Sequence, residues 1–142
     1  MAKLTITGVQ HETGADGMSG QGYPAFSGAT ELAKGQIVAI NGELASAVDK
    51  VKAAFGYVAW DTGRGVNGKV VANQSFRIVR EAWVELDVAK VAGTKIYLSD
   101  VAGELSDVAG TEEIVVGVYI AEPENGNATD LSHQAVLDFK LY

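Results

Sequence analysis

The chain has 142 residues, contains no Cys and carries a formal net charge of -7. This length suits one domain, and the lack of Cys excludes disulfides, thiolate metal sites and a cysteine nucleophile. The acidic balance disfavours nucleic-acid binding, and the sequence shows neither an apolar run long enough to span a membrane nor a secretory leader. We therefore expect a soluble protein that binds neither nucleic acid nor membrane and stays where it is made.

Glycine distinguishes the first 30 residues from the rest of the chain. Six Gly lie between positions 8 and 28, and only residues 3–7 resemble a strand. Such a composition raises the entropic cost of ordering a segment. We expect an extended arm over residues 1–30 that needs another surface to lie on, followed by a single domain over residues 31–142.

A strand pattern occurs twice in the remaining chain, about 60 residues apart. The first copy comprises residues 35–40, 42–44 and 55–59, and the second comprises residues 93–98, 103–105 and 116–120. Gly42 and Gly56 are separated by the same number of residues as Gly103 and Gly117. The sequence therefore predicts a duplicated strand-turn-strand unit.

Two further stretches alternate between apolar and polar residues. Residues 76–88 predict one long strand, or two strands separated by a bulge near Arg80, and residues 134–142 predict a closing strand. Asn-Gly pairs between the apolar stretches favour tight turns, and residues 45–55 allow at most a single helical turn. These features predict an all-β fold, a compact β-barrel or β-sandwich built from the duplicated unit.

Two short motifs suggest ligand chemistry but fit poorly. Residues 63–69 resemble a phosphate-binding loop, yet Val70 replaces the required hydroxyl residue and a strand follows in place of a helix. Asp49-Lys50 in an all-β unit resembles the modified Lys of lipoyl carrier domains, although the flanking residues differ. We expect ordinary loops at both places and keep a lipoyl- or biotinyl-type carrier domain as an alternative function.

The remaining polar and aromatic residues show no catalytic pattern. His11 and His133 lack second ligands at metal-site spacing, and no nucleophile with an adjacent base is evident. We therefore expect neither enzymatic activity nor a metal or other cofactor. Trp60 and Trp83 are expected in the core or at an interface, or as a stacking platform in a carbohydrate- or receptor-binding module of a phage fibre.

Charge is distributed unevenly along the chain. Residues 59–95 carry six Lys or Arg against four acidic residues, whereas residues 96–142 carry nine acidic residues against one Lys. All three Arg, namely Arg64, Arg77 and Arg80, lie in the basic part. This asymmetry indicates either a solvated acidic face or two complementary patches, in which case the three Arg are candidates for contacts between subunits.

The second copy of the duplicated unit carries a family resemblance. Taken in order, residues 83–86, 91–100, 103–105 and 115–122 resemble the capsid cement or head decoration proteins of tailed bacteriophages. The shared features are a strand ending in an acidic or apolar step, an Ala-Gly-x-x-hydrophobic-Tyr strand, a Gly-x-Leu/Val turn and a Val-Gly-Val/Tyr-Ala strand. The resemblance covers residues 32–122, with a similar closing strand at residues 134–142.

The resemblance implies a structural virion protein on the outer surface of a phage capsid. Such proteins are β-barrel-like, bind major capsid protein subunits, commonly as homotrimers at threefold and quasi-threefold positions, and use an N-terminal arm to reach the lattice. The arm here would pair with the capsid through an added strand at Leu4, Thr5 and Ile6, together with Tyr23 and Phe26. A deletion of residues 2–22 is then expected to leave a folded protein that no longer coats heads.

Overall fold

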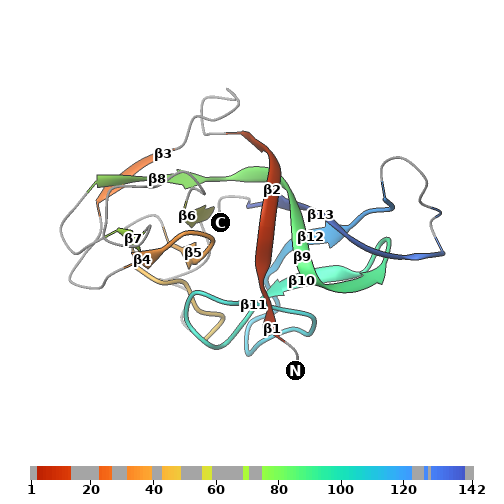
Figure 1. Ribbon diagram of the computed structural model, residues 1–142. Coiled ribbons are helices and arrows are strands. Elements are labelled where there is room, and N and C mark those ends of the chain that lie inside the picture. The colour runs from red at the N-terminus through yellow and green to blue at the C-terminus, as the bar shows by residue number, and fades with distance from the viewer. Residues whose placement is uncertain are drawn as a thin grey trace.

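The computed structural model is built from β-strands and turns (Figure 1). It describes residues 3–13, 23–26, 32–39, 43–48, 56–58, 69–70, 75–122, 127 and 129–139, and these residues include no helix. The strands are β1 (Lys3–Leu4), β2 (Ile6–Thr13), β3 (Tyr23–Phe26), β4 (Leu32–Ala33), β5 (Ile37–Val38), β6 (Gly56–Val58), β7 (Lys69–Val70), β8 (Ser75–Val79), β9 (Glu81–Val91), β10 (Lys95–Leu98), β11 (Leu105–Ser106), β12 (Val115–Tyr119) and β13 (Leu131–Asp138). The predicted all-β fold is confirmed.

A seven-stranded antiparallel sheet forms a nearly closed barrel. Its strand order is β1-β11-β10-β12-β13-β9-β2. The two outermost strands of this order, β1 and β2, follow each other in the chain with only Thr5 between them. Because β1 pairs with β11 and β2 pairs with β9, one N-terminal segment joins both ends of the sheet. Figure 1 shows this segment in red, running along β9.

The N-terminal segment contributes to the core. Leu4 and Ile6 are 2% and 6% exposed, and both belong to the main apolar cluster. Thr5 lies between β1 and β2 and is held by Asp87. The Thr5 N–H donates to Asp87 Oδ1 (2.8 Å), and the Asp87 N–H donates to the Thr5 carbonyl (3.0 Å). The segment therefore changes its partner strand at Thr5 while its backbone groups stay paired.

This placement corrects the expectation of an arm over residues 1–30. Residues 3–13 pair with strands of the barrel, and residues 23–26 form β3, which pairs with β8. Leu4 and Ile6 therefore face the core of their own domain, and the domain does not begin at residue 31. The physical reason is that the alternating apolar residues need cover, and the sheet itself offers two edges that a strand can join. The rest of the expected arm lies outside the described residues.

The predicted duplication recurs in the backbone hydrogen bonds. Gly35 and Gly93 occupy equivalent turns, with φ of 82° and 93°. The Gly35 N–H donates to the Val58 carbonyl (2.9 Å), and the Gly93 N–H donates to the Tyr119 carbonyl (2.8 Å). Gly adopts a positive φ without the steric cost that a Cβ brings. The same residue type therefore serves the same turn twice.

A second pair of glycines marks the next equivalent position. Gly56 in β6 and Gly117 in β12 each lie close to a neighbouring strand. A Cβ added at Gly56 would collide with the carbonyl of Val79, and one added at Gly117 would collide with the carbonyl of Val136. The two apolar-Gly-apolar steps of the sequence are thus explained by two equally close strand contacts.

The duplication is longer in the structure than in the sequence pattern. We call residues 23–79 the first repeat and residues 81–139 the second repeat. In the second repeat, β9 and β13 pair along most of their length. In the first repeat, two shorter pairs take the place of this long one. The pair β3 and β8 corresponds to the start of β9 with the end of β13, and the pair β4 and β7 corresponds to the end of β9 with the start of β13.

The two repeats share one core. The main apolar cluster joins Ile37, Tyr57 and Val79 of the first repeat to residues such as Val84 and Leu98 of the second. The opposite face of the first repeat holds a smaller buried cluster, made of Leu32, Val38, Val58 and Ile78. Because the repeats bury side chains in common, they form one domain.

Candidate interaction surfaces

Among the described residues, no three His, Cys, Asp or Glu side chains gather to hold a metal ion. Tyr119 is 1% exposed, and its hydroxyl donates to the Val88 carbonyl (2.6 Å). Burial, followed by the charges of Asp87 and Asp107, raises the pKa of Tyr119 to about 12. The phenol therefore stays neutral and links β12 to β9 as a structural group.

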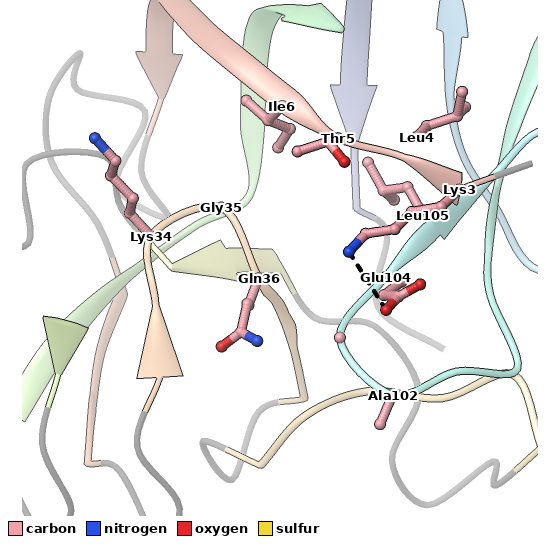
Figure 2. Close-up of a pocket in the computed structure, with 11 residues that line it drawn as sticks. Lys3, Leu4, Thr5, Ile6, Lys34, Gly35, Gln36, Ala102, Glu104 and Leu105 are labelled. Carbon is pink, nitrogen blue, oxygen red and sulfur yellow. Dashed lines mark ion pairs between the residues drawn. The ribbon is translucent and has the colours of Figure 1, made fainter. Parts of the chain in front are cut away.

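A small groove lies beside the N-terminal segment (Figure 2). It has a volume of about 130 Å³ and is lined by residues 3–6, 34–36 and 102–105. Lys3 Nζ and Glu104 form an ion pair there (3.5 Å), whereas the Lys34 side chain extends away from this pair. Sites for small molecules usually enclose about 300 Å³ or more. The groove is therefore smaller than a pocket that encloses a drug-sized ligand.

Two identical hexapeptides form neighbouring loops next to β11. The sequence Leu-Ser-Asp-Val-Ala-Gly occurs at residues 98–103 and again at residues 105–110. In each copy the Ser side chain is buried, and its Oγ accepts the N–H of the Val two residues later, at 3.0 Å for Val101 and 3.2 Å for Val108. This local hydrogen bond fixes the turn and leaves the Val at the surface.

A third loop has the same arrangement with a different sequence. Ser46 Oγ accepts the Val48 N–H (3.2 Å) and donates to the Asp100 carbonyl (2.9 Å). The Ala47 N–H donates to the Ser99 carbonyl (3.0 Å). These contacts attach the loop of the first repeat to the first hexapeptide of the second repeat.

Asp100, in the first hexapeptide, binds Thr111, the residue that follows the second hexapeptide. Its two carboxylate oxygens accept the Thr111 N–H (2.7 Å) and the Thr111 hydroxyl (3.0 Å). Gly110 lies against both Asp100 and Ala47, with no room for a side chain. The three loops are therefore held together by their own polar groups.

The three loops expose one valine each. Val48, Val101 and Val108 are 59%, 54% and 42% exposed. We call residues 46–48, 99–102 and 106–109 the valine loops. Binding residues are disproportionately carried on loops that a rigid scaffold positions.

Sequence reasoning missed the valine loops, although a signal was present. The same six residues occur twice within 13 positions, from residue 98 to residue 110. A Ser that follows a buried Leu and precedes Asp-Val-Ala-Gly favours a turn in which the Ser binds the backbone ahead of it. Finding that hexapeptide twice predicts two equal turns with equal exposed residues.

Of the three predicted Arg residues, Arg80 is the one whose side chain the structure describes. Arg80 lies between β8 and β9, is half-buried, and donates from its guanidinium to the Phe139 carbonyl. The guanidinium holds the end of β13 against the start of β9, and a subunit contact at Arg80 stays a prediction. Arg77 lies in β8, where its backbone pairs with Pro24. The remaining predicted features, Arg64, Lys50, Trp60 and residues 63–68, lie outside the described residues.

Comparison with known proteins gives no relative. No family model, curated protein or solved structure matches the chain. In the part of the chain that the structure describes, no helix has the length and apolar character needed to cross a membrane. Function has to be inferred from the surface of this chain.

Proposed function

We propose that this protein is a noncatalytic structural protein of a phage particle, bound to the outer surface of the capsid through major capsid protein subunits. The observation that carries the proposal is the set of valine loops, which present exposed apolar side chains on a fixed backbone. Such a surface recognises another protein by shape and by burial of apolar area. The role calls for no cofactor and no bond-making chemistry.

Rigid loops suit attachment to a fixed lattice. Ser99 and Ser106 are 3% and 0% exposed, so the turns that present Val101 and Val108 are anchored in the core. A surface that is ordered before binding loses little conformational entropy when it docks. An assembly of several copies would present several sets of valine loops at once and gain from their simultaneous attachment.

Binding to head particles tests this proposal. Particles that lack the protein are mixed with the wild type or with a variant in which Val48, Val101 and Val108 are all changed to Ser. Bound protein is then measured by co-sedimentation and by electron microscopy. We expect the wild type to coat the particles and the triple variant to lose most of its occupancy, because it no longer buries apolar surface on docking.

The matched control is Leu131→Ser, which changes an apolar residue that is 66% exposed and lies outside the valine loops. This variant should bind as the wild type does. Equal binding by the wild type and the triple variant, or no binding by the wild type, would contradict the proposal.

A further inference from the structure

One face of the barrel carries apolar side chains where polar ones are usual. Strands β9, β13 and β12 align three of them in a row, since Trp83 lies opposite Val136 and Val136 lies opposite Val118. Tyr97 on β10 and Val115 on β12 form the next pair on this face. These five residues are half-buried or exposed, with Val118 at 38%. We call them the outer apolar face.

The internal duplication shows the same face in a covered state. Tyr57 lies opposite Val79 between β6 and β8, as Val118 lies opposite Val136 between β12 and β13. Tyr57 and Val79 are both 0% exposed and belong to the main core. Equivalent positions are therefore fully covered in the first repeat, whereas in the second Val136 is half-buried and Val118 is 38% exposed.

Charged side chains flank the outer apolar face with opposite signs at its two ends. Lys95 lies at the β10 end, opposite Val118. At the β9 end Glu81 lies opposite Asp138, and Glu85 follows Glu81 on the same exposed face. Two like charges directly opposite each other destabilise a sheet. Among the described residues, none of these three carboxylates and no other acid forms an ion pair with Lys95.

We propose that the outer apolar face is a contact between two copies of this chain, related by a twofold axis that runs parallel to the strands. Such an axis places the β10 end of one face over the β9 end of the other. Lys95 then lies over the partner's Trp83, between the partner's Glu81 and the partner's Glu85, and the apolar centres of the two faces meet. Each copy supplies the cation that the acidic end of its partner lacks.

A second copy is the occupant that this charge pattern fits. A face that carries both signs at opposite ends is complementary to itself after a twofold rotation, whereas a uniformly charged partner would be repelled at one end. The contact does not depend on capsid binding, because it uses strands β9, β10, β12 and β13 and leaves the valine loops free for another protein.

Sedimentation equilibrium of the purified full chain tests this contact. We expect the wild type to dimerise reversibly and Val118→Lys to remain monomeric at the same concentrations, because the new charge would be buried without a partner. Lys95→Glu should weaken dimerisation about tenfold or more by bringing like charges together, and adding Glu81→Lys to the same chain should restore most of that loss. Leu131→Lys places the same charge at an exposed position outside the face and should dimerise as the wild type does.

Circular dichroism and urea unfolding establish that each variant is folded. If Val118→Lys fails to fold, the charge reversal at the two exposed positions Lys95 and Glu81 decides the question. A wild type that stays monomeric up to its solubility limit would overturn the proposal. So would a dimer that Val118→Lys leaves intact, a trimer in place of a dimer, or a double charge reversal that restores nothing.

Discussion

The N-terminal segment is the best place to test the fold, because a core role and an arm role predict opposite results. Leu4 is 2% exposed and lies opposite Leu105 across β1 and β11. Replacing Leu4 by Ala removes buried apolar surface and leaves a cavity, which in packed cores costs about 2–5 kcal/mol. We expect a loss of about 3 kcal/mol, near the middle of that range.

Equilibrium unfolding in urea measures this loss. With a slope of about 1–3 kcal/mol per M, a loss of about 3 kcal/mol lowers the unfolding midpoint by about 1–3 M. Thr5→Ala is the matched control, because Thr5 is exposed and its two hydrogen bonds to Asp87 use only its own backbone. That variant should stay within about 0.5 kcal/mol of the wild type.

A wild-type midpoint for Leu4→Ala, combined with loss of capsid occupancy, would refute this reasoning and favour the arm. The same logic reverses the expectation for the deletion of residues 2–22. Because this deletion removes β1 and β2 and opens the barrel, it should yield a protein that is strongly destabilised or fails to fold.

Three further substitutions test two of the glycines that mark the duplication, Gly117 and Gly93, and the buried phenol of Tyr119. Gly117→Ala should cost about 2–4 kcal/mol in urea unfolding, because its Cβ collides with the Val136 carbonyl, and a cost below about 0.5 kcal/mol would contradict that close approach. Gly93→Ala meets no atom within 4 Å but has to keep a φ of 93°, so the expected loss is smaller, about 1 kcal/mol. Folded Tyr119 has a pKa of about 12 against 10.0 when unfolded, so the unfolded chain releases its proton first. Stability that is complete below pH 10 should therefore fall between pH 10 and 12 in the wild type, and Tyr119→Phe should lack this part of the decline, as measured by unfolding at a series of pH values.

Strand content and duplication could be read from the sequence because both are local properties. Alternating apolar residues report which side of a strand is covered, and Gly at a tight turn or a close strand contact has few substitutes. Gly35 and Gly93 carry the same φ sign and the same hydrogen bond, which is why the two copies resemble each other in sequence. The bulge expected near Arg80 follows from the same alternation, and β8 and β9 do separate at that residue.

The place of the N-terminal segment could not be read correctly from the sequence because it depends on long-range partners. Gly content describes how much entropy a free segment loses, but it does not reveal that the edges of β9 and β11 lie within reach of residues 3–13. Likewise, the charge of Arg80 does not reveal that the Phe139 carbonyl lies beside it. The valine loops could have been found, since their repeated hexapeptide is a local signal.

The way the barrel closes has a consequence for how the protein is made. Lys3 and Leu4 leave the ribosome about 100 residues before Ser106 and Leu105, which are their partners in the sheet. Strand β1 therefore stays unpaired, with its apolar side chains uncovered, until β11 has been synthesised. Contacts so distant in sequence slow folding and lengthen the time during which nascent chains can associate wrongly. A circular permutant that begins in the second repeat and places residues 3–13 after β13 would shorten the time during which β1 lacks its partner strand.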